Sequence, residues 1–207
     1  PIPELMEKMD NWASDPGKFE MVVAALGIIG QISDESVVET VASHLRHVDY
    51  TIKTTAIKTL QNIGSPKCLK FLFPTLKLAD EPAALLILDL IGSFEAPETI
   101  LPLLRVMGRS EEAVKKKILS FLTSFPPDQL ETVIEGNLNN APPGLRRNAL
   151  RLFEATGRVE AARRIREQFK DDVEIKPVVK QTTDQLSCKI KTSGDMAMLS
   201  LSGILDV

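Results

Sequence analysis

Few residues of this 207-residue chain have side chains suited to catalysis or metal binding. There are only two histidines, His44 and His47, and two cysteines, Cys68 and Cys188. Two histidines three residues apart share a helix face, but a metal site needs further ligands, and the cysteines lack metal-ligand spacing. We therefore expect the histidines to be solvated or capping and the cysteines to be buried small hydrophobic residues. The sequence contains no Gly-rich phosphate loop and no nucleophile elbow, so it predicts no catalytic residue, metal site or cofactor.

Charge offers a second kind of chemistry, because it is unevenly spread along the chain. The net charge of −3 disfavours non-specific nucleic-acid binding, yet residues 141–170 carry about +5. Six basic residues in this stretch fall on two predicted helix faces. They are Arg163, Arg166 and Lys170 on one face, and Arg146, Arg147 and Arg151 on the other. We expect these residues to bind an acidic partner, and a solvated helix face is the simpler interpretation of the same pattern.

The elements that position these residues recur about every 32 residues. Five segments align on the residue that closes an apolar helix: Gly30, Gly64, Gly92, Phe125 and Gly157. Apart from Ser124, Thr156 and Lys117, the residues one, four, seven and eight positions before these anchors are apolar, and these positions share one helical face. Four anchors are glycines, so we expect left-handed helix ends there, whereas two prolines after Phe125 end the fourth helix.

A second helix is expected after each anchor. The five ranges are 33–48, 65–79, 96–107, 126–138 and 158–169. Asp34, Asp49 and Asp80 fit helix N-caps, because a short carboxylate side chain can accept from the unpaired N–H groups of the first turn. Residues 2–12 are expected to form the second helix of an incomplete preceding repeat.

This array resembles the HEAT family, in particular the short bacterial HEAT-like repeats also seen in phycobilisome lyases. Residues 72–76 (LFPTL) and 101–104 (LPLL) look like the family's proline-containing second helix, and residues 49–64 (DYTIKTTAIKTLQNIG) look like its first helix. The resemblance covers residues 15–169. It implies an all-α fold, a right-handed α-solenoid of about five helical hairpins within residues 1–169, with the second helices along a concave surface. Tetratricopeptide arrays have a similar period, but their Trp, Gly and Tyr pattern is absent.

The composition changes after residue 169. Pro177 and β-branched residues without helical periodicity predict an interdomain linker at 170–185. Apolar and polar residues then alternate on both sides of a turn at 192–195, which predicts a β-hairpin within 186–207.

The end of this tail carries a second resemblance. Residues 198–206 (MLSLSGILD) resemble the opening of a STAS domain, the anti-sigma-factor-antagonist fold. The resemblance implies that 186–207 is the beginning of a truncated STAS-like domain, and a hairpin that caps the solenoid is the simpler interpretation. Its unpaired strand edges also favour self-association.

Together these features predict a non-enzymatic protein-interaction scaffold, a cytoplasmic bacterial signalling adaptor that binds a protein or peptide partner on its concave surface. Two alternatives stay open: a bilin-lyase-like chromophore-handling enzyme and a HEAT-like nucleic-acid-binding protein. The charge balance opposes the second. No apolar run is long enough to span a membrane, and no signal peptide is visible. The ends at Pro1 and Val207 predict a fragment of a longer protein.

Overall fold

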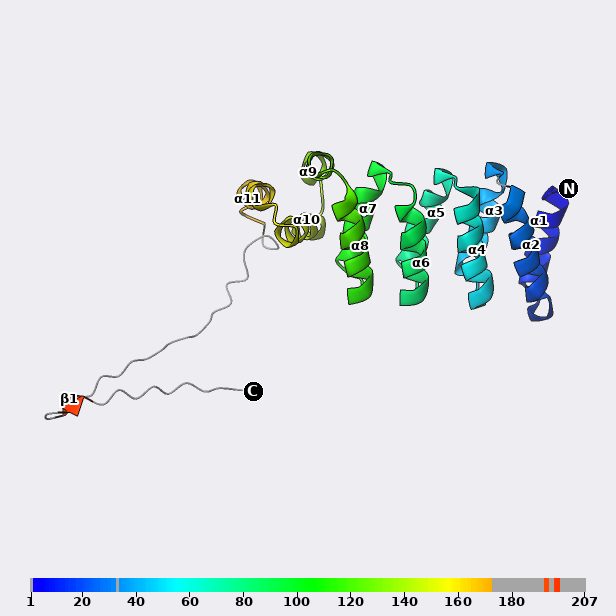
Figure 1. Cartoon of the computed structure of the whole chain (residues 1–207), viewed down its shortest axis with the longest axis horizontal. Coiled ribbons are helices and arrows are strands. Elements are labelled where there is room, and N and C mark those ends of the chain that lie inside the picture. Colours follow the sequence, from blue (N-terminus) through cyan, green and yellow to red (C-terminus); the bar gives the residue numbers. More distant parts are fainter. Residues whose placement is uncertain (1, 33, 173–191, 194–195, 198–207) are drawn as a thin grey trace. The chain divides into compact units, whose positions relative to one another are not determined.

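The computed structural model describes residues 2–32, 34–172, 192–193 and 196–197. Contacts divide the chain into two units, Pro1–Lys176 and Pro177–Val207. The described residues of the first unit form helices joined by short loops, which confirms the predicted all-α class for that unit (Figure 1). None of the described helices combines the length and the apolar character that crossing a membrane requires.

The helices of the first unit follow the predicted order. The α-helices are α1 (Ile2–Ala13), α2 (Phe19–Ile32), α3 (Val38–Ser43), α4 (Tyr50–Ile63), α5 (Leu69–Leu76), α6 (Glu81–Gly92), α7 (Ile100–Met107), α8 (Glu112–Ser124), α9 (Pro127–Leu138), α10 (Pro143–Ala155) and α11 (Val159–Gln168). The 3₁₀ turns are η1 (Pro16–Lys18), η2 (Glu35–Val37), η3 (His44–Arg46), η4 (Pro66–Cys68) and η5 (Pro97–Thr99). Three of the predicted second helices therefore begin with a 3₁₀ turn, a common form at helix ends.

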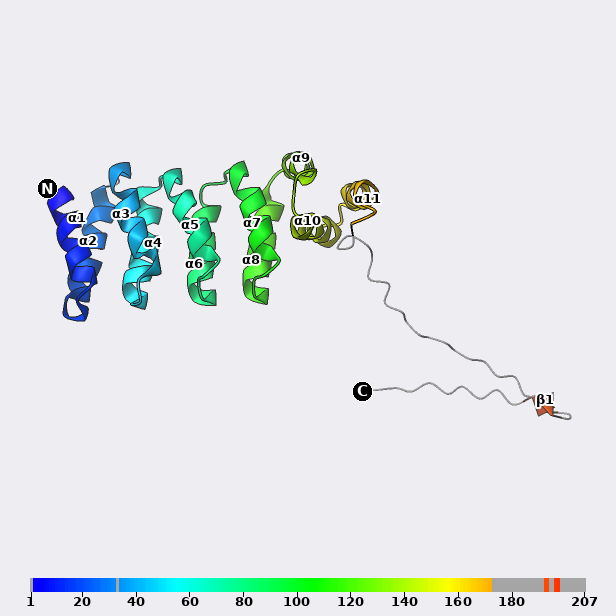
Figure 2. The same cartoon turned by 180° about the vertical axis from the view of Figure 1, so that it is seen from behind.

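These helices stand in two rows. In the first row α2, α4, α6 and α8 lie side by side, each packed against the next, as Figures 1 and 2 show from opposite sides. In the second row η3 contacts α5, α5 contacts α7, and α7 contacts α9. The buried core between the rows includes Ile52, Leu72, Ile87, Leu103 and Ile118, each with an exposed fraction of 0%.

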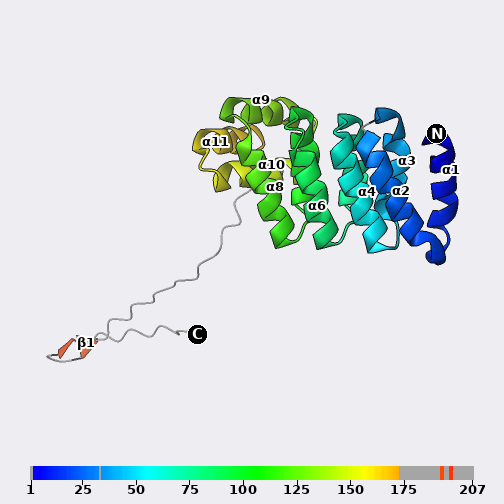
Figure 3. The same cartoon turned by 45° about the vertical axis from the view of Figure 1, so that its right-hand side comes forward.

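The last three helices are turned relative to the first row. Figure 1 views α9 and α11 close to their axes, whereas α2, α4, α6 and α8 are seen from the side, and Figure 3 shows α9–α11 grouped next to α8. Helix α10 packs against α7, α9 and α11. Asn148 of α10 lies against Gly108, the residue that follows α7.

The predicted N-caps are confirmed. The carboxylates of Asp34, Asp49 and Asp80 accept hydrogen bonds from backbone N–H groups two or three residues later, at 2.8 to 3.0 Å. Each of them therefore satisfies one N–H group that a helix start leaves unpaired.

Two of the four glycine anchors have the predicted left-handed conformation. Gly64 and Gly157 have positive φ angles of 66° and 70°, as expected for helix ends. Gly30 and Gly92 instead lie within α2 and at the last position of α6, so the prediction of left-handed ends is wrong there. These two glycines allow close packing between neighbouring helices: a Cβ atom on Gly92 would lie 3.2 Å from the ring of Phe121.

In the second unit the structure describes two short strands. β1 (Thr192–Ser193) pairs antiparallel with β2 (Met196–Ala197), so Thr192 and Ser193 are strand residues rather than part of the predicted turn. The remaining residues of the predicted hairpin and of the STAS-like ending lie outside the described residues. The linker was predicted to begin at residue 170, but Asp172 still forms an ion pair with Arg146 at 3.3 Å.

Candidate functional site

On α11 the predicted basic face is met by the protein's own carboxylates. Arg163 forms ion pairs at 2.8 Å with Glu160 and Glu167 of the same helix, and hydrogen bonds to both carboxylates raise the pKa of Arg163 above its ordinary value. Arg166 pairs with Glu154 of α10. These two arginines therefore offer a partner less unbalanced charge than their spacing suggests.

Arg146 of α10 contacts the end of α9 and the residues that follow α11. Its guanidinium donates to the carbonyls of Leu138 and Asn139 at 3.1 and 2.9 Å, and it lies 4.2 Å from the centre of the Phe169 ring. With its ion pair to Asp172, these contacts join the end of α9 to the chain after α11. We assign Arg146 a structural role on these contacts.

The other three predicted residues, Arg147, Arg151 and Lys170, differ in burial and surroundings. Arg151 and Lys170 are exposed, and neither forms an ion pair with any residue that the structure describes. Arg147 is half-buried and lines a cleft at the start of α10.

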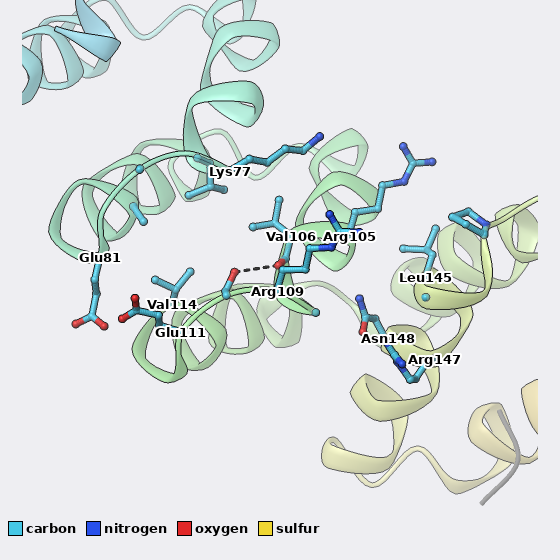
Figure 4. Close-up of a pocket in the computed structure, with 17 residues that line it drawn as sticks. Lys77, Glu81, Arg105, Val106, Arg109, Glu111, Val114, Leu145, Arg147 and Asn148 are labelled. Carbon is cyan, nitrogen blue, oxygen red and sulfur yellow. Dashed lines mark hydrogen bonds between the residues drawn. The ribbon is translucent and has the colours of Figure 1, made fainter. Parts of the chain in front are cut away.

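That cleft lies among the later helices of the unit. It has a volume of about 610 Å³ and lies where α10 meets the ends of α5 and α7 and the starts of α6 and α8 (Figure 4). Six charged residues line it: Lys77, Arg105, Arg109 and Arg147, which are basic, and Glu81 and Glu111, which are acidic.

Three of the basic residues are exposed and carry unbalanced charge. Lys77 follows the last residue of α5, Arg105 lies in the last turn of α7, and Arg109 follows α7. A cation near a helix C-terminus is favoured by the helix dipole, which explains the first two positions. Within the described residues none of the three forms an ion pair, whereas Lys117 pairs with Asp89 at 2.5 Å.

The two acidic residues lie together at one end of the cleft. Glu81 is the first residue of α6 and Glu111 is the N-cap residue of α8, and Figure 4 shows their carboxyl groups next to each other. The hydrogen bond with the Glu111 carboxyl, together with burial and the charge of Glu111, raises the pKa of Glu81. In the described part of the chain no basic side chain pairs with either carboxylate.

A buried amide forms the wall of the cleft at α10. Asn148 has an exposed fraction of 4%, and its Nδ2 donates a hydrogen bond of 2.9 Å to the carbonyl of Leu104 in α7. Its amide lies against Gly108, the residue after α7. This contact holds α10 against the helix that carries Arg105.

The two histidines and Cys68 contribute to the hydrogen bonding and packing of the helical unit. His47 donates from Nε2 to the carbonyl of Ala13 at 2.9 Å, and its Nδ1 accepts from the N–H of Asp49 at 3.0 Å, which is a capping role. His44 is buried rather than solvated, and it is the C-cap residue of α3, in agreement with the capping half of the expectation. No group of three metal-ligating side chains forms among the described residues.

Cys68 is buried as predicted, and Cys188 lies outside the described residues. Burial raises the pKa of the Cys68 thiol to about 11. The thiolate is the nucleophilic form of cysteine, so Cys68 is a weak nucleophile near neutral pH.

Sequence reasoning missed Lys77, Arg105 and Arg109. A signal existed, because Leu76-Lys77 and Leu104-Arg105 occupy equivalent positions of successive repeats, at the same interval as Gly64 and Gly92. The concentration of positive charge at 141–170 favours α11 instead.

Comparison with known proteins identifies no matching family model, and no curated protein matches the chain.

Proposed function

We propose that this chain is a non-enzymatic, HEAT-like α-solenoid scaffold that binds an acidic segment of a partner protein. The observation that carries the proposal is the group of three exposed cations, Lys77, Arg105 and Arg109, which line one cleft without an ion pair among the described residues. Three unbalanced charges in a concave site attract a segment of opposite charge.

The solenoid part of the proposal is supported by the two rows of helices and by the repeat period of the sequence. Each helix of the first row packs on the next helix of that row, and α3, α5 and α7 of the second row pack on α4, α6 and α8 of the first, as expected when successive helical hairpins stack. Stacked helical hairpins present an extended surface, and such a surface suits a peptide better than a small molecule. The right-handed sense and the HEAT family are part of the same proposal.

The basic positions also extend beyond the cleft along the second row. Arg46, at the end of η3, follows the buried Leu45 as Lys77 follows the buried Leu76. Arg46 is exposed and, like Lys77, forms no ion pair within the described residues. Since η3, α5 and α7 are neighbours, an acidic segment laid along this row would meet one cation per repeat.

An acidic peptide tests this proposal directly. We would measure the anisotropy of a fluorescein-labelled oligo-glutamate peptide with the wild-type chain and with the double variant Arg105→Gln/Arg109→Gln. We expect wild-type binding that weakens as salt is raised, and a loss of about 10-fold in the variant, because each partly exposed ion pair contributes roughly 0.2–1 kcal/mol.

The matched control is Arg163→Gln/Arg166→Gln, which removes the same charge from a face that is already paired. It should weaken binding by less than the cleft variant does. Equal losses in both variants would show attraction by net charge alone, and a larger loss in the control would favour the α11 face. Either result contradicts the proposed cleft, as would an absence of binding by the wild-type chain. Melting temperatures of both variants check that they fold.

A further inference from the structure

We infer that the segment bound in this cleft carries a basic residue close to its acidic residues, and that Glu81 and Glu111 receive this basic residue. The inference rests on the proposed function and adds the charge pattern of the partner. It follows from the division of the cleft into a basic part and an acidic end (Figure 4).

The division arises from the polarity of the helices. Residues at the ends of α5 and α7 and at the starts of α6 and α8 line the cleft. Cations are favoured at helix ends and carboxylates at helix starts, so each charge suits its own helix. The same rule brings two carboxylates together, because α6 and α8 are neighbours in the first row. Like charges held side by side repel each other, and nothing within either helix relieves that repulsion.

No lysine near Glu81 and Glu111 pairs with either carboxylate among the described residues. Lys115, four residues after Glu111, pairs with Glu112 at 3.3 Å. Lys53 of α4 lies 3.9 Å from Asp80, the residue before Glu81. Lys77 is only four residues before Glu81 in sequence, yet these two side chains form no ion pair. The carboxylate pair is therefore available to a cation from outside the chain.

A cation placed between the two carboxylates would gain more than at an ordinary surface site. It would interact with both charges and would also offset the repulsion between the two carboxylates. A lysine or arginine side chain on the partner supplies such a cation, while acidic residues of the same segment meet Lys77, Arg105 and Arg109.

The acidic end also argues against a nucleic acid in this cleft. A nucleic-acid strand carries a negative charge on every phosphate, so a strand filling the cleft would bring phosphates against Glu81 and Glu111. A peptide can place opposite charges within one short segment, and this matches the two parts of the cleft.

Three fluorescein-labelled peptides of equal length test the inference. One carries a lysine before a run of glutamates, one carries it after the run, and the third has glutamine in place of lysine. We expect one of the lysine peptides to bind the wild-type chain up to about 5-fold more tightly than the glutamine peptide, the size of a partly exposed ion pair. The double variant Glu81→Gln/Glu111→Gln should lose this preference.

Glu95→Gln/Glu98→Gln is the matched control variant, since both residues are exposed and lie outside the cleft. It should keep the preference. If all three peptides bind equally, or if the preference survives in Glu81→Gln/Glu111→Gln, the inference is wrong while the proposed function stands. If no peptide binds, both are wrong. Tighter binding of a single-stranded oligonucleotide than of every peptide would overturn both in favour of a nucleic-acid partner.

Discussion

The side-chain amide of Asn148 lies against the backbone of Gly108, so closely that a Cβ atom on Gly108 would be 2.5 Å from Nδ2. The same Nδ2 donates to the carbonyl of Leu104, 44 residues earlier in the chain. Both contacts join α10 to the end of α7, the helix that carries Arg105. The position of α10, and with it the wall of the cleft, depends on this buried amide.

The first prediction concerns these two residues. Gly108→Ala should destabilise the protein by about 1–3 kcal/mol, because the added methyl group overlaps the amide. Asn148→Ala should cost about 1–3 kcal/mol, because the carbonyl of Leu104 loses its donor. In the double variant the methyl group has room, so the two losses should sum to less than their separate values. Urea unfolding of the four proteins measures this coupling.

Gly27→Ala provides a control for glycine replacement within a helix. A Cβ atom on Gly27 would meet nothing within 4 Å, and α2 contains this residue. This variant should be more stable by up to about 1 kcal/mol, because alanine favours helix more than glycine does. Strict additivity of Gly108→Ala and Asn148→Ala would contradict the close contact.

The fold was largely predictable because it depends on local patterns. Helix faces follow from the spacing of apolar residues, and caps such as Asp49 act within three residues of their own position. Gly92 shows the limit of this reasoning. Its sequence context resembles that of Gly64, but Gly92 is helical and lies against Phe121 of α8, and no residue near position 92 encodes that approach.

The site was less predictable for the same physical reason. Arg163 and Arg166 stand out by spacing, yet ion pairs set how much of their charge a partner meets, and the pair of Arg166 with Glu154 joins two helices. Lys77 and Arg109 lie on different helix ends far apart in the sequence, and the fold brings both to one cleft. Charge density along the chain predicts a basic segment, whereas the unbalanced charge of a cleft depends on tertiary contacts.

The second prediction concerns Glu81 and pH. The neighbouring Glu111 carboxyl raises the pKa of Glu81 in the folded state, and in the unfolded chain that pKa is ordinary. The folded state thus holds this proton more tightly, so stability falls as the pH rises through the unfolded and then the folded pKa. Glu81→Gln removes this loss.

The melting temperature of Glu81→Gln should therefore exceed that of the wild type at about pH 7 and equal it well below the ordinary glutamate pKa of about 4.3. Glu98→Gln, an exposed carboxylate with no ion-pair partner in the described region, serves as the control and should show no such pH-dependent gain. A lower melting temperature for Glu81→Gln at neutral pH would show that the carboxylate is stabilising and would contradict the repulsion.

The third prediction concerns His47, which links the end of α1 to the start of α4. His47→Ala should cost about 1–3 kcal/mol, because the carbonyl of Ala13 and the N–H of Asp49 each lose a partner. The packing of its ring on Phe19, with ring centres 4.8 Å apart, is lost as well. The neighbouring Arg46→Ala is the control, because Arg46 is exposed and makes no such contact. Similar unfolding free energies for the two variants would show that the bridge contributes little.

The fourth prediction concerns the reactivity of Cys68. With a pKa of about 11, only about one thiol in a thousand is ionised at pH 8, and burial also blocks access to the sulfur. In a Cys188→Ser variant, iodoacetamide should therefore label Cys68 at least about 100-fold more slowly in the folded state than in urea, since an ordinary cysteine has a pKa of about 8.5. Mass spectrometry of the labelled peptide follows the rate.

The dependence of the labelling rate on urea shows whether iodoacetamide reaches Cys68 through local opening of the helices or directly in the folded state. If iodoacetamide reaches Cys68 only when α5 and η4 open, the rate should rise with low urea concentrations well before global unfolding. A fast rate without urea would show that the folded state exposes a thiolate, which would contradict the buried thiol and would favour a chromophore-handling role for Cys68. A slow labelling rate that rises with urea would indicate that Cys68 is a buried core residue of the helical unit.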